Sequence, residues 1–338
     1  MDWFHRLTGF RERDYADTRR RLEVDGRRLR SRVNGRAWAI GTLELPSLAR
    51  LRERVRAGQG PAGRLQVRTL SGDARALHRA PEFAGALFQV ASQFNMLEMI
   101  DPSVRPEDGV CRYERDRTQG PACAIAAGAA TIFRNYFAPV GEQAGQTADR
   151  QLDGLADLGV ALGQRLGQPV ERLWRMQNGY ALCTADGLAA IGRHLTEASE
   201  NERDALRGLL RIGLHRDVGV TDGAAAAAGP LVSQAFCSAL PVAYTRLPAR
   251  AWAPFATLVL EAAYEATLWA AVLAARDGGS NVVLLTRVGG GAFGNADAWI
   301  DRAMRRALDL VRSFALDVRL VSFDAPPESM RALARAFA

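Results

Sequence analysis

The stretch VVLLTRVGGGAFGN, residues 282–295, is the most informative part of this chain. A β-branched, apolar run indicates a strand, which ends in Gly289, Gly290 and Gly291, and a helical pattern begins directly after Asn295. Glycines at such a turn let the backbone approach a ligand closely and aim several N–H groups at one anion. The N-terminus of the following helix adds a partial positive charge. The stretch therefore predicts a strand–loop–helix unit that binds a phosphate or diphosphate.

The same loop has two other interpretations. Gly289, Gly291 and Gly294 satisfy the GxGxxG pattern, and Asp324 ends the next predicted strand, as in a dinucleotide-binding fingerprint. Against it, few residues follow Asp324 from which the remaining strands of a nucleotide-binding half could form, unless their order is permuted. A tight turn without a ligand is disfavoured, because each glycine carries a cost in backbone entropy.

The composition narrows the chemistry of that site. Hydrophobic residues make up 48% of 338 residues, enough for one large α/β domain or two smaller ones. All 44 basic residues are arginine and none is lysine, which excludes Schiff-base catalysis and a Walker-type phosphate loop. Phosphates must then be held by backbone, hydroxyl, amide or arginine groups.

The sequence offers no sign of a metal, a disulfide or a membrane. Its four cysteines and four histidines form neither CxxC nor HExxH patterns, so we expect reduced thiols and no cofactor. No apolar run is long enough to span a membrane, and the N-terminus is too charged for a signal peptide. We expect a cytoplasmic protein without membrane contacts.

The chain divides near residue 63. Residues 1–63 form an Arg-rich arm or subdomain, with a helix near 4–21, a hairpin over 22–45 and a linker over 59–63. This arm, with Trp3, Phe4, Arg6, Arg11 and Arg13, leaves open an acidic partner such as a nucleic acid, although a solvated face is favoured. From residue 64 onward, strands and helices alternate, which predicts an α/β domain.

The periodicity sets the expected elements of that domain. Strands are expected over 65–69, 87–93, 175–183, 213–220, 231–242, 282–288 and 317–323, and helices over 122–137, 149–166, 186–195, 201–210, 254–275, 297–314 and 327–336. The alanine run 224–228 is expected to be a loop. Helix 254–275 is apolar nearly all round, so it should be covered on both sides.

Four segments, in order, resemble the macrodomain family of ADP-ribose-binding modules. They are LQVRTLSGDARAL (65–77), LFQVASQFNML (87–97), LVSQAFCSALPVAYT (231–245) with the long apolar helix after it, and the 282–295 stretch with LDVRLVSFD (316–324). The resemblance implies a three-layer α/β/α fold with a mixed, mainly parallel central sheet, preceded by a small N-terminal subdomain. Residues 64–338 would form the ADP-ribose-binding domain, with an insertion at about 138–220.

The resemblance also implies roles for single residues. Asp73 would accept the adenine amino group and Asn95 would hydrogen-bond the distal ribose. Phe323 would stack on adenine, with Asp324 nearby. The diphosphate would be wrapped by the loop residues Gly289, Gly290, Gly291, Ala292, Phe293, Gly294 and Asn295.

One departure from the family pattern points to the catalytic candidates. The family's first phosphate loop after the Asn is missing, and Thr118-Gln119-Gly120-Pro121 is interpreted as its replacement. Asp116, Gln119 and Glu98 are the candidate catalytic residues, because a carboxylate could activate water against an oxocarbenium-like centre. The alternatives are a helix cap for Thr118 and a surface position for Glu98.

The expected function is therefore binding of ADP-ribose or an ADP-ribosylated macromolecule, with hydrolysis of the ADP-ribosyl linkage. Two other functions stay open: a non-catalytic ADP-ribose reader, and an NAD-dependent oxidoreductase that uses the GxGxxG loop.

Overall fold

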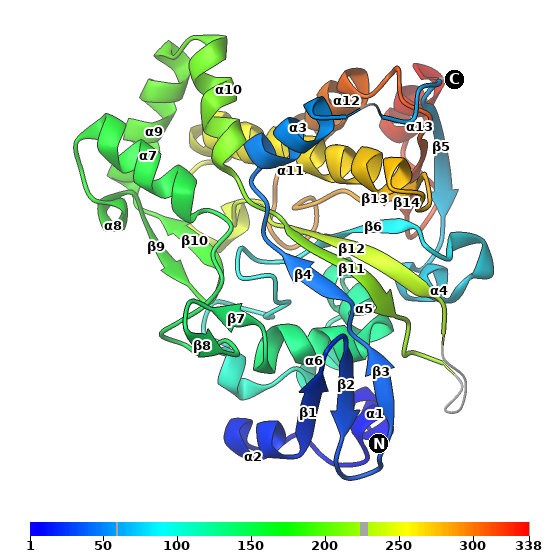
Figure 1. The fold of residues 1–338 in the computed structure, drawn as a ribbon. Helices are drawn as coiled ribbons and strands as arrows, with labels where there is room; N and C mark the ends of the chain where they lie inside the picture. The colour runs from blue at the N-terminus through cyan, green and yellow to red at the C-terminus, as the bar shows by residue number, and fades with distance from the viewer. Residues whose placement is uncertain (59, 224–228, 338) are drawn as a thin grey trace.

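The centre of the molecule is a seven-stranded mixed sheet with the order β4-β11-β12-β6-β13-β14-β5 (Figure 1). The computed structural model describes residues 1–58, 60–223 and 229–337, so the predicted loop over 224–228 and residue 59 of the predicted linker lie outside it. The strands are β4 (Thr42–Glu44), β5 (Gln66–Ser71), β6 (Leu87–Ala91), β11 (Gly213–Gly219), β12 (Leu231–Cys237), β13 (Val282–Leu285) and β14 (Asp317–Ser322). The pairs β12–β6, β6–β13, β13–β14 and β14–β5 are parallel, whereas β11 is antiparallel to β4 and β12. The predicted mixed, mainly parallel sheet is confirmed.

Helices cover both faces of this sheet, which confirms the three-layer α/β/α class. Figure 1 shows α3, α11 and α12 on one face and α5 and α6 on the other. Their bounds are α3 (Leu48–Arg56), α4 (Ala74–Arg79), α5 (Gln119–Ala126), α6 (Gly128–Tyr136), α11 (Ala249–Arg276), α12 (Asp297–Leu310) and α13 (Glu328–Arg335). Neighbouring residues of β6 face opposite layers, since Leu87 belongs to the large core on the α11 side and Phe88 to a second core on the other.

Helix α11 is the core helix of the large layer. It contacts α3, α9, α10 and α12, which confirms that the apolar 254–275 segment is covered on both sides. By length and composition alone α11 could cross a membrane, so the expectation that no apolar run is long enough to do so is wrong. However, 83% of its most apolar window is buried inside the protein. The core helix of a soluble protein has the same properties.

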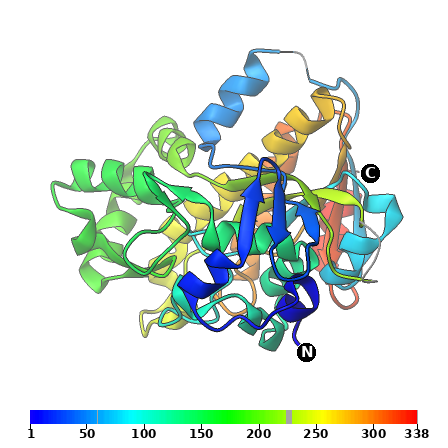
Figure 2. The same cartoon turned by 60° about the horizontal axis from the view of Figure 1, so that its bottom comes forward.

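The N-terminal part packs against α6 and shares one hydrophobic core with α5 and α6. The predicted helix over 4–21 is two helices, α1 (Trp3–Thr8) and α2 (Tyr15–Arg20), because Gly9 ends α1 in the left-handed conformation. The strands β1 (Leu22–Asp25), β2 (Arg28–Ser31) and β3 (Ala37–Ala39) follow and come to the front in Figure 2. Trp3 and Phe4 are 4% and 0% exposed, so these two rings belong to the core, and docking of an acidic partner by the arm stays a prediction. The boundary at residue 63 stays a prediction, although β4 and α3 before it join the main layers.

Most of the 138–220 segment lies to one side of the sheet (Figures 1 and 2), whereas β11 near its end is a strand of the sheet itself. That this segment is an insertion stays a prediction. Besides β11 it contains β7 (Pro139–Val140), β8 (Gln143–Ala144), α7 (Ala156–Leu166), α8 (Val170–Leu173), β9 (Trp174–Gln177), β10 (Tyr180–Cys183), α9 (Ala185–Glu197) and α10 (Glu200–Leu209). The predicted strand over 175–183 is wrong, since Asn178 and Gly179 both have positive φ and fold it into the β9–β10 hairpin. The predicted helix over 122–137 is likewise broken at Ala127, between α5 and α6.

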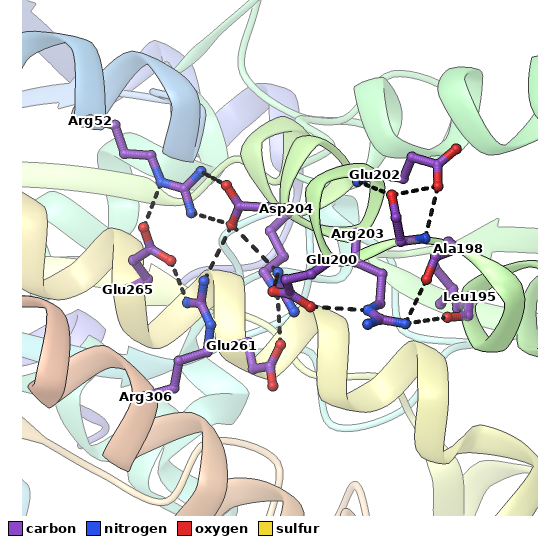
Figure 3. A network of polar contacts seen from close by, with 12 residues as sticks. Arg52, Leu195, Ala198, Glu200, Glu202, Arg203, Asp204, Glu261, Glu265 and Arg306 are labelled. Carbon is purple, nitrogen blue, oxygen red and sulfur yellow. Dashed lines mark hydrogen bonds and ion pairs between the residues drawn. The ribbon is translucent and has the colours of Figure 1, made fainter.

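A network of ion pairs ties α3, α10, α11 and α12 together (Figure 3). Arg52 of α3 binds both carboxylate oxygens of Asp204 of α10 at 2.8 Å. Glu265 of α11, 2% exposed, accepts from Arg52 and from Arg306 of α12. Burial pushes the pKa of Glu265 upward, but the hydrogen bonds from both arginines hold it below its ordinary value. The network therefore holds α3 and α10 against α11 and α12.

Candidate active site

A cavity of about 160 Å³ opens at the carboxyl ends of β6, β12 and β13. Ligands of open α/β sheets bind at such an edge. Its lining comprises Ala91, Ser92, Gln93, Glu98, Met99, Ile100, Asp116, Thr118, Gln119, Gly120, Pro121, Tyr180, Ala239, Tyr244, Arg287, Val288, Gly289, Gly291, Ala292 and Phe293. Pockets for small molecules span roughly 300–1,000 Å³, so the enclosed space suits only part of a dinucleotide-sized ligand.

The glycine loop after β13 supplies unpaired main-chain donors to this cavity. The N–H groups of Gly289, Gly291, Ala292 and Phe293 have no acceptor among the described residues. A Cβ added at Gly291 would meet no atom within 4 Å, so the loop leaves open space there. Four unsatisfied donors beside open space are the arrangement that an oxyanion needs.

Two buried side chains fix the shape of the loop. The Tyr264 hydroxyl of α11 donates to Thr286 O (2.6 Å) and accepts from the N–H of Val288 (3.0 Å). The Asn295 amide donates to Leu240 O (2.9 Å) and Gly289 O (3.3 Å). The main-chain donors are thus held in place before any ligand arrives.

The start of α5 provides a second set of donors. The first N–H groups of a helix lack intrahelical acceptors, and those of Gln119 and Gly120 have no acceptor among the described residues. Thr118, the N-cap residue, makes no side-chain cap bond, so the cap interpretation of Thr118 is wrong. By contrast, Asp297 in the first turn of α12 is itself a carboxylate at that helix start. The helix dipole at the cavity therefore comes from α5, and not from the helix after the glycine loop as the sequence suggested.

Arg287 also lines the cavity but is already paired. Its guanidinium binds Asp297 and Asp301 at 2.7 and 2.5 Å. Phosphate charge would then be met mainly by main-chain groups, which are among the groups that remain in a chain without lysine.

Glu98 is the most unusual acid of the cavity. It is 2% exposed, and neither carboxylate oxygen has a hydrogen-bond partner in the described part of the chain. Burial raises the pKa of Glu98 to about 7, and the Arg134 cation opposes part of that rise. The surface position that was the alternative for Glu98 is wrong. A carboxyl group with a pKa near neutrality can both donate and accept a proton at physiological pH.

Asp116 and Gln119 both line the cavity but make different hydrogen bonds. Asp116 is half-buried, and its Oδ1 accepts from the N–H of Thr118 (2.8 Å). The Gln119 amide accepts from the N–H of Ala91 (2.8 Å) and donates to Gln89 O (3.0 Å). Gln119 therefore joins α5 to β6, which leaves its side chain little capacity for a ligand.

The predicted ligand-binding residues separate into three groups. Thr118, Gly120, Gly289, Gly291, Ala292 and Phe293 line the cavity. Gly290, Gly294 and Asn295 belong to the same loop but do not line the cavity. The third group, Asp73, Asn95, Phe323 and Asp324, lies outside the lining.

The residues of the third group are engaged elsewhere or exposed. The Asp73 carboxylate accepts from the N–H of Arg75 and caps α4. Asn95 is fully buried, donates to Gln151 and accepts from the N–H of Leu97. Phe323 is 75% exposed beyond β14, and Asp324 beside it is also exposed. Their proposed roles toward adenine and ribose stay predictions.

Two aromatic residues beside the predicted Phe293 were not predicted from the sequence. Tyr180, Tyr244 and Phe293 have ring centroids 5.1–5.5 Å apart and line the cavity together. Tyr180 comes from the β9–β10 hairpin of the insertion, and no local pattern indicates that this hairpin reaches the glycine loop. Among the described residues, no group of three or more His, Cys, Asp or Glu side chains is arranged to hold a metal.

Comparisons with known proteins find similarity in structure only. No protein-family model matches the chain, and no curated protein matches it. Similar solved structures include poly(ADP-ribose) glycohydrolase from Thermomonospora curvata, with 16% identity, a TM-score of 0.45 and coverage of 95% of this chain and 96% of that chain. The enzyme of the same name from Deinococcus radiodurans in complex with ADP-ribose has 14% identity, a TM-score of 0.45 and coverage of 87% and 93%. Likeness at these values carries no argument about the activity of this chain.

Proposed function

We propose that this protein binds ADP-ribose, free or attached to a macromolecule, and hydrolyses the ADP-ribosyl linkage. One observation carries the proposal: two sets of unpaired main-chain donors line the same cavity as a buried acid whose carboxylate oxygens accept no hydrogen bond from the described residues. The donors belong to the glycine loop and to the start of α5, and the acid is Glu98. The resemblance to macrodomains supports ADP-ribose as the diphosphate compound.

The donors suit a diphosphate because it presents several anionic oxygens to more than one element. Gly289, Gly291, Ala292 and Phe293 would hold it from one side and the α5 N-terminus from the other. The limited volume supports a pose in which only the diphosphate and distal ribose enter the cavity. The adenosine end would lie outside it, where the exposed ring of Phe323 is a candidate stacking surface.

Glu98 suits the hydrolysis better than Asp116 does. In its acid form it would protonate the leaving-group oxygen as the bond from that oxygen to the anomeric carbon breaks. Water would then add to the oxocarbenium-like carbon and return a proton to the Glu98 carboxylate, which restores the acid. Asp116 is more exposed and its carboxylate already accepts from the N–H of Thr118, so it is less suited to meet the leaving group.

A two-part experiment tests the proposal. Calorimetry compares ADP-ribose, NADH and AMP as ligands, and a release assay follows ADP-ribose from an ADP-ribosylated protein with wild type, E98Q and the exposed-acid control E53Q. We expect ADP-ribose to bind most tightly, and E98Q to bind it but to lose turnover at least a hundredfold, a general-acid contribution of roughly 10²–10⁴. Binding without turnover in wild type would favour the reader, and preference for NADH would favour the oxidoreductase.

The reducing cytoplasm also stays our proposal for its location. All four cysteines are unpaired, which fits a compartment where thiols remain reduced.

A further inference from the structure

Arg134 of α6 is a fully buried cation directly behind the candidate acid. Its Nε donates to Met96 O (3.0 Å) and its Nη2 to the Thr131 hydroxyl (3.0 Å). The guanidinium also lies 3.8 Å from the centre of the Phe236 ring. These contacts fix it in one position.

His215 contributes a neutral partner to Arg134. Its Nε2 lies 2.6 Å from Ile40 O, which can only accept, so Nε2 carries the proton. The Nδ1 lone pair then faces Nη1 of Arg134 at 3.5 Å. Burial, with the Arg134 charge, lowers the pKa of His215 to about 3, so His215 brings no charge at neutral pH.

Glu98 is the carboxylate that pairs with Arg134. Nη2 of Arg134 lies 3.6 Å from Oε1 of Glu98, and both side chains are at most 1% exposed. At that distance the contact is an ion pair without a hydrogen bond. The carboxylate oxygens thus keep their lone pairs for a ligand or a water molecule.

Arg134 also binds the backbone before Glu98. Met96 has φ of +63°, a left-handed conformation that is uncommon for a non-glycine residue. Its carbonyl accepts from Arg134, and its side chain is buried. Beyond the turn, Glu98 Cγ lies 3.2 Å from the position that a Cβ on Gly120 would take. The Glu98 side chain therefore lies against the start of α5.

We propose that Arg134 is a positioning residue for the reaction: it holds the turn at Met96 and the Glu98 carboxylate together, and it governs the pH at which Glu98 exchanges its proton. The claim that Arg134 serves a reaction rests on the proposed function, whereas the coupling between Arg134 and Glu98 does not.

Few other charges act on Glu98. Tyr113 of the 3-10 turn Cys111–Arg115 accepts from the Glu98 N–H, and burial keeps the pKa of Tyr113 well above its ordinary value. Cys123 of α5 is also buried with a raised pKa. Both groups are neutral near pH 7, and so is His215 behind Arg134. Without the Arg134 cation, burial would raise the pKa of Glu98 further, because the main charge that opposes this rise would be gone.

The experiment is a titration of the Glu98 carboxyl by ¹³C NMR in wild type and R134M, with E98Q used to assign the signal. We expect the midpoint to move up by about one to three pH units in R134M, the effect of losing an opposite charge within 4–6 Å. The matched control is R207M, which also removes a buried arginine (4% exposed) but one paired with Glu261. An unchanged midpoint in R134M, or the same upward move in R207M, would overturn the proposal.

The experiment also covers the case in which R134M is too unstable to fold. Should R134M not fold at pH 8, the proposal requires that it fold at pH 5.5 or in the E98Q background, because either change removes the uncompensated carboxylate. Failure to fold under all three conditions would overturn it.

The pH profile of hydrolysis provides the functional readout. In R134M the alkaline limb should move up together with the NMR midpoint. A profile that stays in place while the midpoint moves would overturn the catalytic part of the proposal. Absence of hydrolysis in wild type would instead contradict the proposed function and leave the NMR comparison valid.

Discussion

Gly289 is the loop residue whose substitution should separate loop geometry from overall folding. It has φ of +77°, and a Cβ at this position would stand 2.4 Å from Ala239 Cβ and 2.8 Å from Asn295 Nδ2. The left-handed conformation costs an L-residue about 1–2 kcal/mol, and the close contacts would force the loop to move. G289A should therefore displace the donors of the following residues.

The expected loss of affinity follows from the hydrogen bonds at risk. A hydrogen bond to a charged group contributes about 1.5–3 kcal/mol, so loss of one diphosphate contact weakens binding about tenfold to a hundredfold. We expect this loss for ADP-ribose with G289A by calorimetry, while the far-UV circular dichroism stays that of wild type.

Two other variants complete the series. G192A in α9, where an added Cβ meets nothing within 4 Å, is the control and should bind ADP-ribose as wild type does. G291A should keep the fold but place its methyl group in the open space of the cavity, and so bind weakly. Wild-type affinity in both G289A and G291A would refute the idea that this loop binds the ligand.

Three further predictions concern the unfolding free energy of the protein. Y264F removes the hydroxyl that donates to Thr286 O and accepts from the Val288 N–H, although this N–H keeps a contact with Thr286 O at 3.1 Å. We therefore expect about 0.5–1.5 kcal/mol less unfolding free energy in urea titrations, together with weaker ADP-ribose binding; loss of stability with wild-type affinity would contradict the role of Tyr264 in fixing the loop. Because burial raises the pKa of Glu98 to about 7 in the folded protein, the folded state binds this proton more tightly than the unfolded chain. The unfolding free energy should then fall as pH rises from about 5 to 7, by at most about 1.4 kcal/mol per pH unit, and E98Q should lack this component; equal slopes in both proteins would disprove it. E265Q removes the buried partner of Arg52 and Arg306 and should lower the unfolding free energy by about 3 kcal/mol, whereas the exposed variant E53Q should change it little.

The fold was predictable where local patterns are strong. The apolar runs that became β6, β13 and β14, and the apolar segment inside α11, stand out because strands and core helices bury characteristic faces. The predictions failed where one residue interrupts a pattern. Gly9 ends α1 in the left-handed conformation, and a Cβ on Gly128 would meet the Trp3 ring at 2.7 Å, so close tertiary packing accompanies the break between α5 and α6.

The candidate site was predictable only in its local parts. The glycine loop and the Thr118–Gly120 segment carry their chemistry in consecutive residues, and both line the cavity. Other parts of the site depend on contacts between distant segments and could not be predicted. They are the rings of Tyr180 and Tyr244, the hydrogen bonds of Tyr264 to the loop, and the Arg134–Glu98 pair. Asn95 donates to Gln151, a contact that the sequence does not indicate, and its role toward the ribose stays a prediction.

The most direct measurement is an amide ¹H–¹⁵N NMR titration of the protein with ADP-ribose. We predict that the largest shifts occur at the N–H groups of Gly289, Gly291, Ala292 and Phe293 in the loop and of Gln119 and Gly120 in α5. Saturable binding that leaves these six amides unmoved would contradict it.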